Sequence, residues 1–318
     1  PANAQWPTLS ASYQLGNTVL GNNLLLGSRL SLGASNSGST SPSGQLVLTG
    51  AISDLTGGTG GIDVFSDTTL KGNSTFSGGV KLYSGVLTFG SSSSSTAAGS
   101  SGPLGTGPLV ISTAGGGYFR GLATLGTQMI ANPVTFEVAD QPYVYRYGTG
   151  SLTLAGPVTL NSSVVLSLNS ESLYLNGVVS GAGGFSSSGP GVLVLNPASG
   201  SNTFTGGVTV AAGTLAAGSV GAFGTNAVTV NGGVIDITDC EKVVVEDCEL
   251  EGSGTVGVSA SGVKDLTVFS FSTENWNRPQ DEVDDLMVLF SELIDREVPD
   301  LDAEGVTIRF IGRLDDLD

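Results

Sequence analysis

The sequence contains no histidine, and only two of its 318 residues are cysteines. Without an imidazole, catalysis by a Ser-His-Asp or Cys-His arrangement is excluded, and so is a metal site with histidine ligands. The two cysteines, Cys240 and Cys248, are separated by eight positions. They could form a disulfide in an oxidising compartment or pack as small buried side chains, and the spacing leaves both alternatives open.

Charged residues are also scarce and unevenly placed. Residues 1–235 contain 6 acidic and 5 basic residues, a net charge of −1, whereas residues 236–318 contain 22 acidic and 6 basic residues, a net charge of −16. The acidic part repels nucleic acid and anionic membranes, so we expect neither as a partner and interpret it as a solvated surface. So sharp a change predicts a chimeric chain made of segments with different origins.

Long apolar runs are missing as well. No run approaches the roughly 18 apolar residues that a membrane-spanning helix needs, so we predict no transmembrane segment. Near the start, Ala2-Asn3-Ala4 fits the small-residue pattern of a signal-peptide cleavage site, which is consistent with secretion.

Glycine and short alternating runs are abundant. The sequence has 49 glycines, and between them lie short stretches in which apolar and small polar residues alternate, such as 151–156 and 164–168. Alternation with a period of two is typical of a strand with one buried face, and the glycines supply the turns. The composition therefore predicts an all-β protein with many short strands.

One repeat organises these strands. Residues 72–90 (GNSTFSGGVKLYSGVLTFG) align without a gap to residues 200–218 (GSNTFTGGVTVAAGTLAAG) at an offset of 128. Further on, Leu104-Gly105-Thr106 is echoed by Phe223-Gly224-Thr225. Because no such unit buries its own apolar face, neighbouring units have to stack.

The unit T-F-x-G-G-V-x-V-x-x-G-x-L resembles the autotransporter-associated β-strand repeat over residues 65–235. The resemblance implies a right-handed parallel β-helix of the kind found in secreted passenger domains. It also implies a location outside the cell or on its surface. We predict a β-solenoid over residues 1–261, in which residues 236–261 form an acidic coil.

Two sets of residues in this solenoid are candidate sites. Tyr143, Tyr145 and Tyr147 alternate along one run, and they form either a binding stripe or, as we expect, aromatic packing along the solenoid. The acidic coil resembles those of polysaccharide-acting β-helix enzymes, whose catalytic carboxylates lie on an exposed sheet. The carboxylates concerned are Glu246, Asp247, Glu249 and Glu251, and we expect them to form a solvated acidic edge.

Residues 262–318 have a different pattern. It predicts a strand at 266–271, a helix that begins at Arg278-Pro279 and a second strand at 306–311, which together make a short α/β segment. We expect such a unit not to extend a solenoid. The helix at 280–297 has one apolar face and could cover the open end of the solenoid. That face consists of Val283, Leu286, Met287, Phe290, Leu293 and Ile294.

Phe271-Ser272-Thr273-Glu274-Asn275-Trp276-Asn277-Arg278-Pro279, with Ile308-Arg309-Phe310-Ile311-Gly312 after the helix, resembles cis-prenyltransferases of the undecaprenyl diphosphate synthase type. The resemblance implies isoprenyl diphosphate chain elongation with Mg²⁺ in the cytoplasm. By resemblance, the substrate-binding residues are Ser272, Glu274, Asn275, Trp276 and Arg278, with Arg278 on the diphosphate. That family also uses an aspartate with a His-Gly-Asn loop and a downstream Arg/Ser site. Neither is found here, so we expect a truncated, inactive fragment with no catalytic residue and no metal.

The most consistent interpretation is a structural or adhesive passenger-type protein that is not an enzyme and has no cofactor. Its ligand would be a surface protein or a glycan, which the sequence does not identify. The alternatives are the prenyltransferase and, behind it, the polysaccharide-acting enzyme.

Overall fold

The structure is a computed structural model of the 318-residue chain. It describes residues 8–9, 18–33, 45–97, 99–113, 119–138, 143–219, 221–224, 228–236, 278–303 and 307, together with the short strands at 242–244, 248–250, 255–257 and 265–267. The chain divides into two compact units, Pro1–Val268 and Phe269–Asp318, and each is described by itself.

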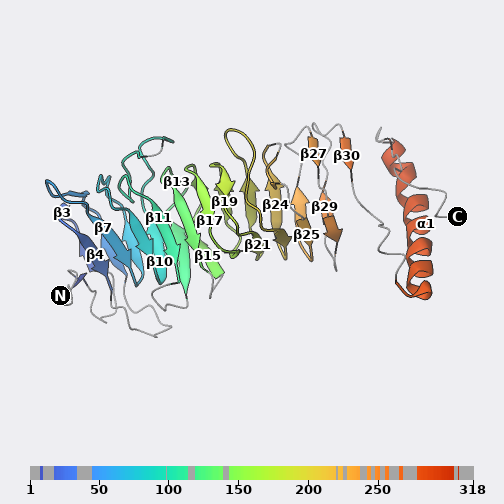
Figure 1. Cartoon of the computed structure of the whole chain (residues 1–318), viewed down its shortest axis with the longest axis horizontal. Coiled ribbons are helices and arrows are strands. Elements are labelled where there is room, and N and C mark those ends of the chain that lie inside the picture. The colour runs from blue at the N-terminus through green and yellow to red at the C-terminus, as the bar shows by residue number, and fades with distance from the viewer. Residues whose placement is uncertain are drawn as a thin grey trace. The chain divides into compact units, whose positions relative to one another are not determined.

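The first unit is a stack of coils whose strands form three long sheets (Figure 1). The eight-stranded sheet contains, in order, β1 (Thr8–Leu9), β4 (Arg29–Leu32), β7 (Gly61–Val64), β9 (Val80–Leu82), β11 (Leu109–Ser112), β14 (Val134–Glu137), β17 (Val158–Leu160) and β20 (Val179–Ser180). The eleven-stranded sheet contains β2 (Thr18–Leu20), β5 (Leu46–Leu48), β8 (Thr68–Leu70), β10 (Gly85–Phe89), β12 (Arg120–Thr124), β15 (Tyr143–Gly148), β18 (Val164–Leu168), β21 (Phe185–Ser188), β23 (Val208–Val210), β25 (Val228–Val230) and β28 (Cys248–Leu250).

The seven-stranded sheet contains β13 (Gln128–Ile130), β16 (Leu152–Leu154), β19 (Ser172–Leu175), β22 (Val192–Leu195), β24 (Thr214–Ala217), β26 (Val234–Asp236) and β29 (Thr255–Gly257). Two-stranded sheets pair β3 (Leu24–Leu26) with β6 (Ile52–Asp54), and β27 (Lys242–Val244) with β30 (Asp265–Thr267). Each of these strand pairs is parallel, for example β18 with β21 and β19 with β22. The predicted parallel β-solenoid is confirmed.

Columns of identical side chains fill the interior. Leu173 lies in register with Leu152 in the coil before it and with Leu193 in the coil after it, and all three are fully or almost fully buried. The outward residues between them remain half-buried, which is the alternation that the sequence shows. Because a fully buried leucine contributes about 1.5–3 kcal/mol relative to an exposed one, these columns are the main source of cohesion between coils.

The two copies of the repeat lie on different sheets. The Gly-Gly-Val strand is β9 of the eight-stranded sheet in the first copy and β23 of the eleven-stranded sheet in the second. In each copy the preceding phenylalanine, Phe76 or Phe204, is fully buried in a segment without a strand. The aromatic ring therefore fills the interior where the coil lacks a strand.

Glycines 85 and 213 are equivalent in the repeat because the backbone requires them. Their φ angles are +83° and +74°. A Cβ atom at Gly85 would lie 2.5 Å from the backbone of Ser66, and one at Gly213 would lie 2.3 Å from the carbonyl oxygen of Gly189. Both positions thus demand a left-handed turn pressed against the previous coil.

One expectation for the C-terminal segment is wrong. β30, which lies in the region predicted not to extend the solenoid, pairs in parallel with β27 and belongs to the first unit. Leu266 is in register with Val243 there. Parallel pairing requires an extended backbone with free hydrogen-bond donors and acceptors, whatever the side chains are. A strand from a different sequence family can therefore pair with β27.

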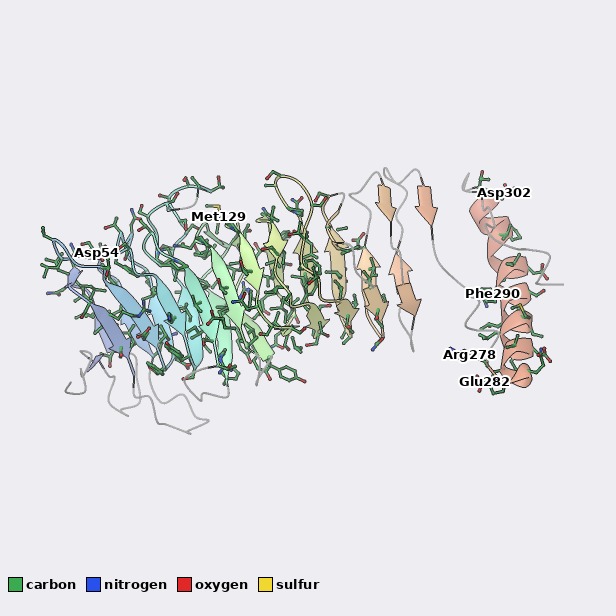
Figure 2. All side chains as sticks on the ribbon, in the orientation of Figure 1. Asp54, Met129, Arg278, Glu282, Phe290 and Asp302 are labelled. Carbon is green, nitrogen blue, oxygen red and sulfur yellow. The ribbon has the colours of Figure 1, made fainter. Side chains whose placement is uncertain are left out.

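The second unit contains helix α1 (Gln280–Ala303), which follows Pro279 as predicted. Backbone N–H groups of Glu282 and Val283 donate to the Pro279 carbonyl at 3.1 and 3.2 Å. Arg278 pairs with Glu282 at 3.8 Å, and both side chains are exposed (Figure 2). Of the predicted apolar face, Val283 is buried, Leu286, Met287 and Phe290 are half-buried, and Ile294 is exposed.

Several predictions for this region lie outside the described residues. They include the side chain of Leu293, all of the second strand at 306–311 except position 307, and Cys240. Whether the helix at 280–297 covers the end of the solenoid stays a prediction. No helix among the described residues is long and apolar enough to cross a membrane.

Candidate functional site

Four aromatic rings form a row on the outer face of the eleven-stranded sheet. Tyr143, Tyr145 and Tyr147 come from β15, and Phe119 directly precedes β12 in the previous coil. Val144 and Arg146, between the tyrosines, are buried, so alternation along the strand turns all three tyrosines outward. We call these four residues the aromatic stripe.

Neighbouring tyrosine rings of the stripe are close to parallel, and Phe119 is tilted by 31° from Tyr147. Tyr145 stacks on Phe119 with a centroid separation of 5.0 Å and an interplanar angle of 16°. Tyr143 and Tyr147 flank Tyr145 at 6.2 and 6.0 Å, with angles of 18° and 20°. Tyr143 is 47% exposed and Phe119 is 38% exposed, which is unusual for side chains of this size. The stripe therefore combines internal stacking with contact to solvent.

A glycine in the neighbouring coil makes room for one ring. Gly121 lies in register with Tyr145, and a Cβ atom at Gly121 would lie 3.2 Å from Cδ2 of Tyr147. The ring of Tyr147 consequently lies over the backbone of β12. Burial raises the pKa of the Tyr147 hydroxyl, with a smaller contribution from Tyr145, so this hydroxyl is protonated at neutral pH.

The strand that carries the stripe is anchored from inside by a buried arginine. The side chain of Arg146 is 2% exposed, and its Nη2 donates to Thr124 Oγ1 at 2.8 Å and to the Gly150 carbonyl at 2.9 Å. Its Nε and Nη1 have no hydrogen-bond partner among the described residues. Burial lowers the pKa of this guanidinium, and Glu171 partly offsets the effect. Arg120, at the other end of β12, donates from Nε to the Ser112 carbonyl at 2.7 Å.

Beyond the tyrosines, the same face carries neutral side chains. Val165, Ser186, Thr209 and Thr229 follow Tyr143 in register, and Ser167 and Ser188 follow Tyr145. All six are half-buried. At about 4.8 Å per strand, the column from Tyr143 to Thr229 extends about 19 Å. We call these six residues the hydroxyl track, because five of them carry a hydroxyl group. The first acidic residue in its register is Glu249, after Thr229.

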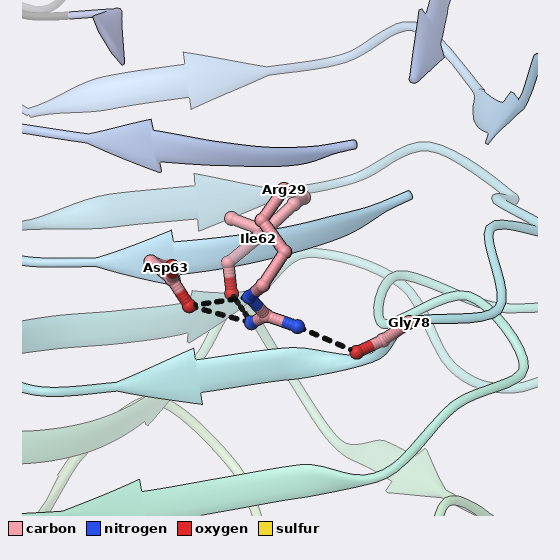
Figure 3. Close-up of polar contacts among 4 residues, drawn as sticks. All are labelled: Arg29, Ile62, Asp63 and Gly78. Atoms are coloured by element: carbon pink, nitrogen blue, oxygen red, sulfur yellow. Dashed lines mark hydrogen bonds and ion pairs between the residues drawn. The ribbon is translucent and has the colours of Figure 1, made fainter. Parts of the chain in front are cut away.

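Two other polar clusters are structural. On the outer face of the eight-stranded sheet, Arg29 Nε donates to Asp63 Oδ1 at 2.8 Å, and its Nη1 donates to the Gly78 carbonyl at 2.8 Å (Figure 3). Asp54 accepts backbone N–H groups from Gly60 at 2.6 Å and Ser77 at 3.0 Å. Each cluster joins successive coils through its hydrogen bonds.

The candidate substrate-binding residues and the acidic-coil carboxylates are mostly outside the described part. Ser272, Glu274, Asn275 and Trp276 are in this class, and so are Glu246, Asp247 and Glu251. Glu249 lies in β28, and Arg278 is exposed beside Glu282. In the described part of the chain, no three acidic or cysteine side chains lie close enough together to hold a metal ion. The expectation of no metal, and of Mg²⁺ under the prenyltransferase alternative alone, stays a prediction.

Sequence reasoning found the three tyrosines but missed Phe119 and the hydroxyl track. Phe119 lies 26 positions before Tyr145, as the two residue numbers give, and only the strand register brings it there. The expectation of aromatic packing is confirmed for the three tyrosines, which stack in sequence, while Tyr143 at the end of the row remains 47% exposed.

Comparison with known proteins finds two families on separate parts of the chain. Residues 67–89 and 188–217 match the passenger-associated-transport-repeat family. Residues 255–318 match the prenyltransferase family described as undecaprenyl diphosphate synthase. Both resemblances are confirmed, and a chimeric chain is consistent with them. The second match includes β29 and β30 of the solenoid.

Two relatives illustrate the match to a short part of the chain. One is the ditrans,polycis-undecaprenyl-diphosphate synthase ((2E,6E)-farnesyl-diphosphate specific) of Xanthomonas axonopodis pv. citri, 63% identical over 51 residues, which are 16% of this chain and 20% of that protein. Another is the isoprenyl transferase of Thermotoga maritima, 55% identical over 56 residues, which are 18% of this chain and 24% of that protein. The chain thus spans a fifth to a quarter of these relatives. No solved structure matches.

Proposed function

We propose that this chain is a passenger-type scaffold that displays binding surfaces outside the cell and acts by adhesion rather than by catalysis. The observation that carries the proposal is the continuous parallel stack, in which both matches to the passenger repeat fall on paired strands. A solenoid of this kind presents long flat faces, which suit contact with extended or repeated ligands.

The chemistry of the described surface supports an adhesive role. The outward side chains of β15, β18, β21, β23 and β25 are aromatic, aliphatic or hydroxylic except at the strand ends. Strongly perturbed pKa values occur at catalytic sites and also at buried structural groups. Among the described residues the shifted groups are Asp54, Tyr83, Arg120, Arg146 and Tyr147, which hold the coils together or pack between them.

The proposal is tested by adhesion under flow. Beads coated with the full chain are passed over layers of epithelial cells and over immobilised matrix, and bead retention is measured. The control is the same chain immobilised after thermal unfolding, because adhesion by the solenoid requires the folded faces. Retention at least five-fold above the control supports the proposal. Equal retention of folded and unfolded chain on every surface contradicts it.

A location outside the cell is tested separately in the producing organism. Intact cells are treated with protease, and the full-length chain is followed with an antibody to residues 143–236. Loss of the antigen from intact cells, or its presence in the medium, supports display. Protection until the cells are lysed contradicts it.

The second candidate is isoprenyl chain elongation. It is favoured by one observation, the 63% identity over 51 residues to a synthase specific for farnesyl diphosphate. We propose that this segment is inactive, because solenoid strands precede it where the resembled family has its aspartate and His-Gly-Asn loop. The test is incorporation of labelled isopentenyl diphosphate into farnesyl diphosphate by the full chain with Mg²⁺. Arg278→Ala is the matched variant. We expect no product above a control without protein, and a product that Arg278→Ala abolishes would reverse this conclusion.

A further inference from the structure

We propose that the aromatic stripe and the adjoining hydroxyl track form a binding site for a neutral polysaccharide. This inference rests on the proposed adhesive function and gives it a ligand class and a place. The four rings and six small side chains lie on one face of one sheet, in columns set by the parallel register.

The stripe suits the apolar face of a sugar ring. The faces of aromatic rings carry partial negative charge, and the C–H bonds on one side of a pyranose are weakly positive, so the two surfaces attract each other. Tyr143 is at the end of the row with 47% of its surface exposed, and its ring neighbour among the described residues is Tyr145. It therefore offers solvent the ring surface that a sugar needs.

Stacking also reduces the conformational entropy that the stripe would lose when a ligand binds. Tyr145 is held by Phe119 at 5.0 Å on one side and by its two flanking tyrosines. A tyrosine has few rotatable bonds, and rings already packed together lose little further freedom when a ligand arrives. A tyrosine hydroxyl can both donate and accept hydrogen bonds at the edge of the row.

The hydroxyl track supplies partners for the sugar hydroxyl groups. Ser167 and Ser188 continue the column of Tyr145, and Ser186, Thr209 and Thr229 continue the column of Tyr143 after Val165. Each serine or threonine hydroxyl both donates and accepts hydrogen bonds. A chain of linked sugars lying along the solenoid axis would meet new hydroxyls at each coil, over about 19 Å.

Charge on this face selects a neutral ligand. The ten residues of the stripe and the track are phenylalanine, tyrosine, valine, serine and threonine, and none is an acidic or basic residue. Binding of a nucleic acid or an acidic polysaccharide requires cationic groups beside the aromatic rings. The nearest guanidinium on β15, Arg146, faces inward and is 2% exposed. Glu171, whose charge acts on Tyr147, would repel an anion further.

A folded protein partner fits this face less well. Stable protein interfaces need about 800 Å² on each side with an apolar centre, and within the hydroxyl track Val165 is the single aliphatic residue. A proline-rich peptide could also stack on tyrosines, but it would leave the track of serine and threonine hydroxyls without partners. The combination of rings and hydroxyls therefore favours the polysaccharide.

The test is retardation of the full chain in native gels that contain a polysaccharide. The neutral probes are dextran, laminarin and galactomannan, the acidic probe is alginate, and poly-L-proline is the peptide probe. We expect at least one neutral probe to retard the chain, and alginate and poly-L-proline to leave its mobility unchanged. Binding of the bound probe should weaken at least ten-fold in Tyr143→Ala/Tyr145→Ala.

Three variants make the result specific. Tyr174→Ala is the matched control, since Tyr174 also points outward from its strand and is half-buried, but it lies in the seven-stranded sheet. It should bind as the unmodified chain does. Tyr143→Phe retains the ring and should keep binding within about three-fold. Ser167→Arg changes an outward residue of the track, and its long side chain should weaken binding several-fold by covering the neighbouring hydroxyls. This variant tests the site even if the double variant unfolds.

The inference is overturned if no neutral probe retards the chain, if the double variant and Ser167→Arg both bind normally, or if poly-L-proline binds in a stripe-dependent way. The bead assay separates this failure from that of the proposed function. Adhesion that persists in Tyr143→Ala/Tyr145→Ala would leave the adhesive function standing without this site. Polysaccharide binding without any adhesion would leave the site standing without that function.

Discussion

Ser74 and Asn202 are equivalent in the sequence repeat and make the same contacts, yet they face different sheets. Ser74 Oγ accepts the N–H of Ile52 in β6 at 3.0 Å, and Asn202 Oδ1 accepts the N–H of Val179 in β20 at 2.8 Å. The backbone N–H of each donates across the coil, to Gly102 and Gly221 respectively. The repeat thus specifies a local turn, and the turn is used at two different places in the coil.

This relationship predicts the effect of Asn202→Ala. Asn202 is 1% exposed, and its Nδ2 also donates to the Ala222 carbonyl at 2.5 Å. Removal leaves two buried backbone groups without this partner, so we expect a loss of about 1–3 kcal/mol in the free energy of unfolding. The exposed Asn231 provides the control, because Asn231→Ala should stay within about 0.5 kcal/mol. Equal denaturation midpoints for the two variants would contradict the role of Asn202.

The leucine columns predict a large effect from Leu193→Ala. Leu193 is fully buried between Leu173 and Leu215, and a cavity there touches three coils. We expect a destabilisation of about 2–5 kcal/mol, measured by denaturant unfolding followed by circular dichroism. Val194→Ala, an outward change on the same strand, should cost clearly less. A smaller effect for Leu193→Ala than for Val194→Ala would mean that the columns do not dominate the stability.

Close backbone approach, more than left-handed backbone conformation, makes Gly213 irreplaceable. Gly57 has a similar φ of +78° with nothing within 4 Å of its missing Cβ, whereas at Gly213 that atom would lie 2.3 Å from a carbonyl oxygen. Gly57→Ala should cost about 1 kcal/mol, from backbone strain alone. Gly213→Ala should lower the thermal midpoint considerably more. Similar midpoints for both variants would show that the coil relaxes to admit the methyl group.

Asp54 predicts how stability responds to acid. Burial acts to raise the pKa of its carboxyl, but hydrogen bonds from Ser77 and the Gly60 N–H outweigh this effect, so the folded pKa lies below the ordinary value of 3.8. A lowered pKa stabilises the fold above the unfolded-state pKa, and this contribution is lost as the pH falls through the folded pKa. Thermal midpoints of the unmodified chain and Asp54→Asn should therefore differ at pH 7 and converge below about pH 4. A constant difference across that range would exclude this source of pH dependence.

The sequence predicted the strands well, because alternation at stretches such as 164–168 reports directly which side chains are buried. It did not predict which sheet each strand joins. That depends on the length and path of each turn, and the long connection between β10 and β11 differs from the short one between β16 and β17. For the same reason the sequence did not predict the contact between Phe119 and Tyr145, nor did it predict the hydroxyl track. Both depend on the register between coils.

Buried arginines were also beyond sequence reasoning. In the sequence Arg146 alternates with three tyrosines, a pattern in which the charged residue is expected to face solvent. In the structure Arg146 faces the interior and the tyrosine rings face outward. Ordinary hydrophobicity predicts the reverse. The partners of Arg146 are Thr124, at the end of β12 in the neighbouring coil, and the Gly150 carbonyl, in the bend after β15, and no local sequence pattern predicts these contacts.

β30 lies within the match to the prenyltransferase family, but its backbone pairs with β27 of the solenoid. The backbone of β27 therefore pairs with a segment whose side chains come from a different family. In a gene fusion at such a site, the junction in the DNA and the junction in the fold need not coincide. A parallel stack can therefore gain strands encoded by another gene at its end, and each added strand needs only backbone pairing rather than a separate hydrophobic core.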